Sequence, residues 1–335
     1  MPPFAPVAPV SRRSLLAGSA GLLALAATPG LSRAAAPVDL DGVTVRAAKY
    51  KGREDNLLRA AGQLDTPYAV TFGEFASGNV IVEAMNAGAV DVGSMSEIPP
   101  VFAAVSGARI KAVAIIADDV NNQVVLVPKD SPIRTPADLA GKRVGYVRAT
   151  TTQYYLARIL KAAGLSFADV TGVPLTPADG RAAFDQGAID AWAIYGYSVP
   201  ITIAASGARV LVTANGYLSG NYIYAARAEA LADPKLSAAI GDYLLRMKRA
   251  WAWQQAHLEE WATIFSGAIG VPRDIVLGQL RNASQPNDLR PVTDDAVASV
   301  QAVADTFIEL GLIPGPVDVA PLFDRRFNDL LAKSA

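Results

Sequence analysis

The chain has 335 residues, of which 51% are hydrophobic, and its formal net charge is −1. This length is enough for about two domains with their own cores, and the near-zero charge gives no support for a nucleic-acid partner. There is no cysteine, and His257 is the one histidine. Disulfides, thiolate chemistry and clustered His or Cys metal sites are therefore excluded, a Ser-His-Asp triad is disfavoured, and we expect neither a metal nor a cofactor.

The N-terminal segment has the pattern of an export signal. Arg12 and Arg13 precede an apolar run over residues 15–27, which is too short to span a bilayer, and small residues follow at 34–36. We expect a signal peptide over residues 1–36. The paired arginines favour the twin-arginine route, with an ordinary signal as the alternative. No cysteine is present to carry a lipid, so the prediction is a cleaved, freely diffusing periplasmic protein.

Apolar alternation and helix-start residues predict a regular succession of strands and helices after the signal. Strands are expected at residues 41–49, 69–75, 90–95, 111–117, 124–127, 143–147, 170–175, 190–194, 209–212 and 221–226. Helices are expected at residues 79–86, 99–105, 151–163, 180–186 and 199–205, then from 233 onward, including 273–281, 294–310 and 323–331. The succession predicts an α/β fold with mostly parallel sheets and a helical C-terminal region.

Two segments about a hundred residues apart share one pattern. Gly88 to Asp91 and Gly187 to Asp190 each follow a predicted helix and read Gly, Ala, a β-branched residue and Asp. The repeat favours two similar α/β lobes, although the same pattern is common in unrelated α/β chains. A cleft between two lobes is a usual place for a small ligand.

The predicted strand order gives the expected domain boundaries. Residues 37–122 and 227–335 are assigned to lobe I, and residues 123–226 to lobe II. The crossings between the lobes, near residues 120–128 and 220–228, are expected to form a hinge.

The segment from Arg148 to Gln153 is the best candidate for binding an anion. It follows a predicted strand and opens a predicted helix, and Thr150, Thr151 and Thr152 lie at the helix start. Hydroxyls and an arginine at the positive end of a helix suit an oxyanion. Simple helix capping by one threonine, with Arg148 in solvent, is the alternative.

Three other loops follow predicted strands and are weaker candidates, because the ligand side of an open α/β sheet is at the carboxyl ends of its strands. Their candidate residues are Ser77 and Gly78; Ser96 and Glu97; and Lys51, Gly52 and Arg53. Each loop also has an alternative interpretation. The first can be a turn with a helix cap, Glu97 in the second can pair with a helix dipole or repel an anion, and the third can be a solvated basic loop.

Aromatic residues gather after the second copy of the repeated pattern. Trp192, Tyr195 and Tyr197 lie at or near the end of a predicted strand. Trp192 and Tyr195 are candidates for an apolar wall around an organic ligand, although burial in the core is the commoner fate of a tryptophan.

The chain resembles the periplasmic solute-binding proteins of ABC importers, in the group that binds aliphatic sulfonates, taurine and nitrate. The resemblance is carried by residues 97–103, 131–142 and, most specifically, 175–194, and it extends over about residues 38–330. It implies a two-lobed type II binding protein with the ligand cleft between the lobes. The contacts it implies with an anionic head are Lys51, Gly52, Ser77, Gly78, Ser96, Thr150, Thr151, Thr152 and Trp192.

The chain departs from that family at two places in the expected site. Tyr195-Gly196-Tyr197 stands where the family has an acidic residue after its tryptophan, and Ala149 replaces a glycine. These changes imply a less acidic and more aromatic pocket.

We therefore expect an exported, monomeric solute-binding protein that captures a small, sulfonate-like organic anion and delivers it to a permease and its ATPase. The alternative is an enzyme of the same fold that acts on a small sulfur or nitrogen compound. The resemblance argues against it, because such enzymes use a cysteine or an active-site histidine that this chain lacks.

Overall fold

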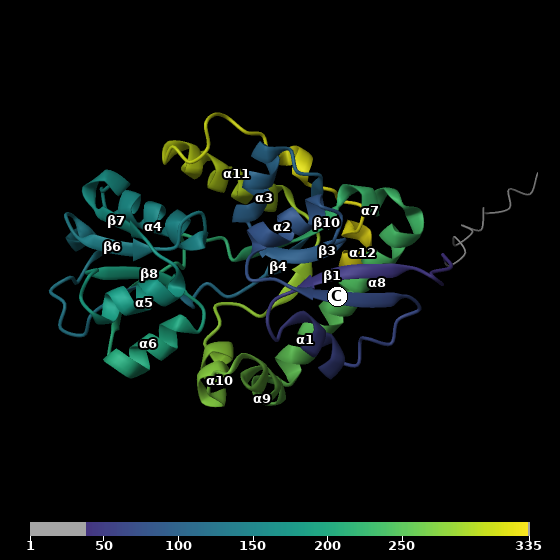
Figure 1. Ribbon diagram of the computed structural model, residues 1–335, viewed down its shortest axis with the longest axis horizontal. Helices are drawn as coiled ribbons and strands as arrows, with labels where there is room; N and C mark the ends of the chain where they lie inside the picture. The colour runs from purple at the N-terminus through teal and green to yellow at the C-terminus, as the bar shows by residue number, and fades with distance from the viewer. Residues whose placement is uncertain (1–37, 334–335) are drawn as a thin grey trace, which may run out of the picture. The chain divides into compact units, whose positions relative to one another are not determined.

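The computed structural model describes residues 38–333. These residues fall within one compact unit that holds two β-sheets and the helices packed against them (Figure 1). The predicted signal peptide over residues 1–36 lies outside the described residues. Within residues 38–333, no helix is both long and apolar enough to cross a membrane.

The first sheet has six strands in the order β11-β4-β10-β3-β1-β2. β1 pairs in parallel with β2 and β3, whereas β10 runs antiparallel to β3 and β4, and β11 antiparallel to β4. The strand bounds are β1 Thr44–Lys49, β2 Ala69–Glu74, β3 Val92–Ser96, β4 Ile110–Ala117, β10 Asn221–Arg227 and β11 Asp288–Arg290.

The second sheet has five strands in the order β7-β6-β8-β5-β9. β6 pairs in parallel with β7 and β8, and β5 runs antiparallel to β8 and β9. The strand bounds are β5 Gln123–Val127, β6 Arg143–Tyr146, β7 Thr171–Pro174, β8 Ala191–Tyr195 and β9 Arg209–Thr213.

Most strands of each sheet run in one direction, as predicted, but both sheets are mixed, because β10 and β11 run against the first sheet and β5 against the second. β5 and β10 directly follow the two segments, residues 118–122 and 214–220, in which the chain passes from one sheet to the other. Each enters its new sheet against the direction of its neighbours. β10 was grouped with lobe II up to residue 226 but pairs with β3 and β4, so the chain returns to the six-stranded sheet earlier than predicted.

Helices cover both faces of both sheets. The α-helices are α1 Glu54–Ala60, α2 Gly78–Asn86, α3 Ile98–Ser106, α4 Thr151–Ala162, α5 Pro177–Asp185, α6 Ser198–Ser206, α7 Ala228–Ala232, α8 Pro234–Ala256, α9 Leu258–Ile269, α10 Arg273–Arg281, α11 Asp294–Glu309 and α12 Asn328–Ala332. Short 3₁₀ turns lie at Pro136–Leu139, Phe167–Asp169 and Ala320–Leu322.

The alternation of side chains along each strand gives every sheet two apolar cores. On β1, Val45 and Ala47 face a core shared with α1 and α8 to α10, and Ala48 faces one shared with α2, α3 and α11. On the five-stranded sheet, α4 covers one face and α5 and α6 the other (Figure 1). The sheets are thus rigid supports for the loops that end their strands.

The repeated Gly-to-Asp pattern has a shared structural role. Asp91 accepts hydrogen bonds from Arg46 at the backbone N (3.0 Å) and the side-chain Nε (2.9 Å). In the five-stranded sheet Asp190 accepts the matching pair from Arg143, at 2.8 and 3.1 Å. The repeat therefore marks an arginine–aspartate clamp between one strand, β1 or β6, and the loop before its parallel neighbour, β3 or β8.

Candidate functional site

A cavity of about 280 Å³ lies where loops from the two sheets meet. Most of its wall is formed by residues at or just after the carboxyl ends of β1, β2, β3, β4, β6 and β8, the edge at which open α/β sheets bind ligands. We call it the threonine cavity. It is lined by Tyr50, Arg53, Ala76, Ser77, Gly78, Asn79, Ser94, Ser96, Pro99, Ile116, Asp118, Ala149, Thr150, Thr151, Tyr195 and Tyr222.

The start of α2 contributes hydrogen-bond donors to this cavity. Ser77 is the N-cap residue, yet its hydroxyl makes no capping bond and is available to a guest. The first backbone N–H groups of the helix have no partner within it. A Cβ on Gly78 would lie 2.8 Å from the Cβ of Met95 and from Cγ of Pro99, so only glycine fits where α2 meets β3 and α3.

The start of α4 lies on the other side of the cavity. Thr150 caps the helix by accepting from the N–H of Thr152 (3.3 Å) and donates to the carbonyl of Val147 (2.8 Å). Thr151 lines the cavity and makes no side-chain hydrogen bond in the described part of the chain. Thr152 is fully buried and accepts from the N–H of Val147 at 2.9 Å, so its hydroxyl holds the loop and does not line the cavity.

Ala149, in the loop before α4, has a φ of +54° and is the non-glycine residue with a positive φ among the described residues. Its N–H is held by Oε1 of Gln153 at 2.8 Å. A Cβ in this left-handed region costs roughly 1 kcal/mol. The departure from glycine noticed in the sequence therefore falls on a strained position in the cavity wall.

Replacing Ala149 by glycine should raise the free energy of unfolding by about 0.5–1 kcal/mol, because the strain is relieved. Ala87, which ends α2 with a φ of −76°, is the matched control, and glycine there should lower stability. Urea unfolding of both variants measures the difference. A stability change of the same sign in both would contradict the assignment of strain to Ala149.

Arg53 is the cation of the cavity wall. Its Nη2 lies 3.8 Å from Oδ2 of Asp118, and the guanidinium makes no hydrogen bond within residues 38–333. Burial lowers the pKa of Arg53, but the carboxylates of Asp118 and Glu54 raise it above its usual value. A charged guanidinium with unused donors therefore faces the cavity.

Besides Thr152, four other candidate residues lie away from the cavity. Lys51 and Arg148 are exposed and line neither this cavity nor the one next to it. Gly52, with a φ of +76°, is packed against α9, where a Cβ would lie 2.9 Å from that of Ala268. Trp192 is fully buried in the core beneath α5, so it forms no cavity wall; the strand turns its ring toward the helices.

Glu97 does not line the threonine cavity either; it is buried where α3 meets the second chain crossing. The hydroxyl of Ser219 donates to its Oε2 at 2.7 Å, and its Oε1 has no hydrogen-bond partner in the described structure. Burial raises the pKa of Glu97 to about 7 from 4.5, although the hydrogen bond from Ser219 opposes the shift. Glu97 is thus a poor repulsive wall for an anion, because it is shielded and partly protonated at neutral pH.

This raised pKa predicts a pH-dependent stability. Between pH 4.5 and about 7 the folded chain keeps a proton on Glu97 that the unfolded chain has lost, so stability falls as the pH rises through that window. The loss amounts to about 2–3 kcal/mol. We expect the variant Glu97→Gln to lack this part of the slope in urea unfolding at pH 4.5 and 7.5. Equal slopes in both proteins would show that Glu97 titrates normally.

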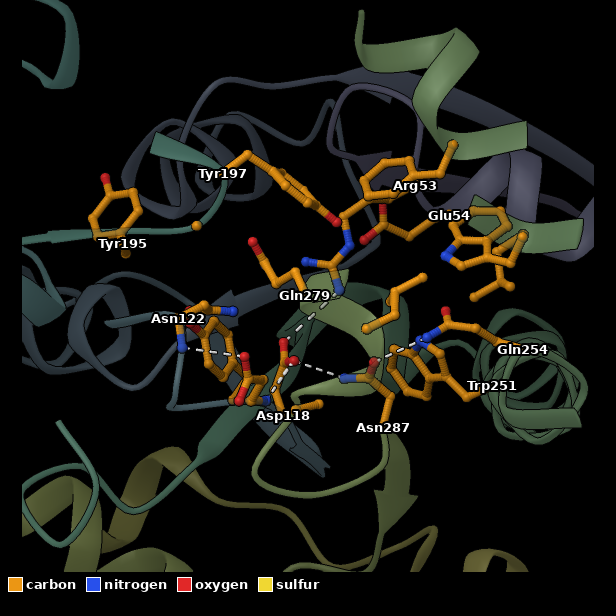
Figure 2. A pocket seen from close by; sticks show the side chains of 18 of the residues that line it. Arg53, Glu54, Asp118, Asn122, Tyr195, Tyr197, Trp251, Gln254, Gln279 and Asn287 are labelled. Atoms are coloured by element: carbon orange, nitrogen blue, oxygen red, sulfur yellow. Dashed lines mark hydrogen bonds and ion pairs between the residues drawn. The ribbon is translucent and has the colours of Figure 1, made fainter. Parts of the chain in front are cut away.

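A second cavity of about 240 Å³, which we call the aromatic cavity, adjoins the first. The two share Arg53, Asp118, Tyr195 and Tyr222. Figure 2 shows Arg53 and Gln279 between the tyrosine end and the Trp251 end of the aromatic cavity. Tyr195 and Tyr197, the two tyrosines of the segment that departs from the family pattern, both line this cavity.

Several residues of the two walls lie outside the loops that the sequence marked as candidates. These side chains are Asp118, Asp119, Tyr222, Trp251, Gln254, Trp261, Gln279 and Asn287. Asp118 and Asp119 directly follow β4, and the rule for strand ends would have flagged them. Nothing in the sequence places α8 to α10 beside that strand end.

Comparison with known proteins identifies the family of the chain. The model of the family described as NMT1/THI5 like matches residues 69–236. A protein of Escherichia coli (strain K12) named an aliphatic sulfonates-binding protein is 33% identical over 302 residues, which cover 89% of this chain and 93% of that protein. The chain belongs to the NMT1/THI5-like family.

Solved structures of the sulfonate-binding family have the same fold. The periplasmic aliphatic sulphonate binding protein SsuA from Escherichia coli matches with a TM-score of 0.77 and 31% identity, over 82% of this chain and 90% of that one. SsuA from Xanthomonas axonopodis pv. citri, an alkanesulfonate-binding protein bound to MOPS, matches with a TM-score of 0.74 and 29% identity, over 84% and 98%. These findings confirm the predicted fold class and family.

Proposed function

We propose that the chain captures an organic sulfonate in the threonine cavity. The observation that carries the proposal is the meeting of two helix starts, α2 and α4, with the guanidinium of Arg53 around one space. Helix starts present unpaired N–H groups and a positive dipole end. A sulfonate stays ionised when buried, so it needs several such donors.

Each part of this wall has a distinct role in the proposal. Ser77 and Thr151 donate hydroxyl hydrogen bonds, the first N–H groups of α2 and α4 complete the shell, and Arg53 supplies the charge. Three or four charge-assisted hydrogen bonds of roughly 1.5–3 kcal/mol each support micromolar affinity once ordering costs are subtracted. Thr150 and Gly78 position the two helix starts. No catalytic group is required, and the relatives named above are binding proteins, not enzymes.

The protein acts, in this proposal, as the periplasmic receptor of an ABC importer. The relatives named above include a protein described as periplasmic. The two sheets form lobes that close when the ligand touches the start of α2 on one side and of α4 on the other. The closed, loaded protein, working as a monomer after its signal is cleaved, then delivers the sulfonate to a permease and its ATPase.

Isothermal titration of the purified protein tests the proposal. Methanesulfonate, butanesulfonate and taurine are the probes, with sulfate and nitrate for comparison. We expect at least one sulfonate to bind with micromolar affinity and more tightly than either inorganic anion. No heat with any sulfonate, or tighter binding of sulfate or nitrate, would overturn the proposal.

Thr151→Val sharpens this test, because valine keeps the shape and removes the one hydroxyl. We expect at least about tenfold weaker sulfonate binding, the effect of losing a hydrogen bond to a charged group. Thr152→Val is the matched control, since its hydroxyl serves the backbone of Val147. That variant should lose stability instead, as measured by urea unfolding. Full affinity in Thr151→Val would place the sulfonate elsewhere.

A further inference from the structure

A small space adjoins the threonine cavity at the two chain crossings, and we call it the hinge cavity. It measures about 10 Å³, so it has room for one water molecule at most. Thr151 and Tyr222 line both spaces and therefore separate the hinge cavity from the proposed sulfonate. The other polar side chains that line it are Glu97, Gln123, Tyr154, Ser219 and Asn221.

Two buried oxygens in the hinge cavity are acceptors without a donor. Glu97 and Gln123 are 4% and 1% exposed, and Oε1 of each has no hydrogen-bond partner within residues 38–333. The other oxygen of Glu97, Oε2, accepts from the hydroxyl of Ser219 at 2.7 Å. The amide nitrogen of Gln123 donates to the hydroxyl of Tyr222 at 3.3 Å. Buried polar atoms are almost always paired, so these two acceptors require a donor between them.

A proton on Glu97 supplies that donor. The neutral carboxyl keeps the bond from Ser219 on one oxygen and presents an O–H on the other. This O–H is a donor for Oε1 of Gln123, directly or through the single water that the cavity admits. No charged side chain other than Glu97 lines the hinge cavity in the described chain, so no ion pair there holds the carboxylate in its charged form. The pKa of Glu97, which burial raises to about 7, agrees with this geometry.

Around the hinge cavity, Glu97 is the group of the described chain that titrates near neutral pH. Tyr154 of α4 and Tyr222 of β10 line the cavity with it, and burial raises the pKa of both hydroxyls. Neutral hydroxyl and amide groups face Glu97 from α11, the second crossing and β10. The charged groups beyond the two tyrosines are Arg53, Asp118, Arg158 and Asp305.

The hydrogen bonds of Glu97 and Gln123 connect the two sheets to the wall of the ligand site. Glu97 precedes α3 beside the six-stranded sheet, and Gln123 is the first residue of β5 in the other sheet. From Gln123 the bonds continue to Tyr222, which lines the threonine cavity. A proton on Glu97 therefore completes a polar chain that ends at the proposed sulfonate.

The charge of an ionised Glu97 would oppose the sulfonate. The carboxylate and the anion would face one another across Thr151 and Tyr222, with little water to screen them. A like charge disfavours ionisation, so the entering anion raises the affinity of Glu97 for its proton. Linkage is reciprocal, and the proton raises the affinity for the sulfonate by the same factor.

We propose that Glu97 is a proton-linked positioning residue, which carries a proton in the sulfonate-bound protein and takes it up from solvent when the anion enters. This inference rests on the proposed function, since the sulfonate supplies the opposing charge. The proton adds to Oε1 of the carboxylate and returns to solvent when the ligand is released. Capture is therefore strongest in mildly acidic solution and weakens as the pH rises.

Calorimetric titration of the purified protein with butanesulfonate at pH 6 and pH 8.5 tests the inference. Bis-tris propane buffers both pH values and contains no sulfonate group that could compete. We expect binding to be at least about tenfold weaker at pH 8.5, because a proton-linked affinity falls by up to about tenfold per pH unit above the pKa of the linked group. A pH electrode in unbuffered solution at pH 7 should record the uptake of roughly half a proton per bound sulfonate.

Glu97→Gln is the informative variant, because its amide imitates the neutral carboxyl, with an oxygen to accept from Ser219 and an N–H to donate to Gln123. We expect it to bind butanesulfonate as the wild type does at pH 6, to keep that affinity within about twofold at pH 8.5, and to take up no proton. His257→Asn is the control, because His257 is the one histidine and lines none of the three cavities. That variant should keep both the pH dependence and the proton uptake.

Equal wild-type affinities at pH 6 and pH 8.5, with no proton uptake, would overturn the inference and leave the proposed function standing, whether or not Glu97→Gln folds. A pH dependence that Glu97→Gln retains, or binding that strengthens as the pH rises, would also overturn it. Absence of sulfonate binding at both pH values would overturn the proposed function and this inference together.

Discussion

Replacing Asp91 by asparagine is expected to lower the free energy of unfolding by about 3–5 kcal/mol, the usual cost of breaking a buried ion pair. The side chain of Asp91 is fully buried, and it meets two guanidinium groups, Arg46 Nη2 at 2.6 Å and Arg227 Nη2 at 2.9 Å. The amide of asparagine would keep one acceptor and point a donor at an arginine. Both guanidinium groups would lose part of their compensating charge.

The chain offers a matched control in Asp190, which makes the same clamp with Arg143 in the five-stranded sheet. Its side chain is 33% exposed, against 0% for Asp91. Water can replace the lost contacts there, so Asp190→Asn should cost about 1 kcal/mol or less. Urea unfolding of the two variants measures both losses. Equal losses would show that burial does not set the strength of the clamp.

The same clamp has a predictable response to acid. Burial alone would raise the pKa of Asp91, but hydrogen bonds from Arg46 and Arg227 lower it below its usual value of 3.8. The folded chain therefore holds this proton less tightly than the unfolded chain. Its contribution to stability is present above about pH 4 and is lost as the pH falls through the lowered pKa. Asp91→Asn should be less sensitive to acid than the wild type between pH 5 and pH 3.

Most of the fold could be predicted because its helices and strands are amphipathic and well delimited. The helix predicted at residues 273–281 is α10, Arg273–Arg281, and the strand predicted at 209–212 is β9, Arg209–Thr213. Three elements were missed. α7, Ala228–Ala232, lies between the strand predicted to end at residue 226 and the helices predicted from residue 233. α1, Glu54–Ala60, is only seven residues long and is held by burial of Leu57 and Leu58. β11, Asp288–Arg290, has three residues and exists through its pairing with β4.

Strand direction could not be read from alternation alone. The pattern of Gln123–Val127 and of Asn221–Arg227 predicts a strand but not which sheet it joins or in which sense. Both strands follow a crossing, so their direction depends on where the chain comes from in space. This is also why the predicted boundary at residue 226 differs from the sheet in which β10 lies.

The site was predictable where its chemistry is local. Helix-start residues such as Ser77, Thr150 and Thr151 can be recognised from their residue type and from their position after a predicted strand. Trp192 could not be placed in this way, since either face of β8 could have carried it into a cleft or a core. Asp118 and Gln279 lie more than a hundred residues apart, so only the packed structure brings them to one cavity.

The largest effect on binding is expected at Arg53. Replacing it by methionine should weaken the binding of butanesulfonate by about 30- to 1000-fold, which corresponds to roughly 2–4 kcal/mol for a charge lost from a buried pair. Arg53 and Asp118 are the charged residues lining the threonine cavity. Without the guanidinium the wall keeps only a carboxylate, which repels the sulfonate. Calorimetric titration gives the ratio, and the melting temperature checks that the variant folds.

Two further variants separate the charge of Arg53 from its hydrogen bonds. Arg53→Lys keeps the positive charge but loses the planar fork of donors, so its loss should be intermediate, about tenfold. The double variant Arg53→Met with Asp118→Asn removes the repelling carboxylate, which lies 3.8 Å from the guanidinium, and should bind more tightly than Arg53→Met alone. If Arg53→Met binds butanesulfonate as the wild type does, the sulfonate does not lie against Arg53. The head group would then have to be held by the starts of α2 and α4 alone.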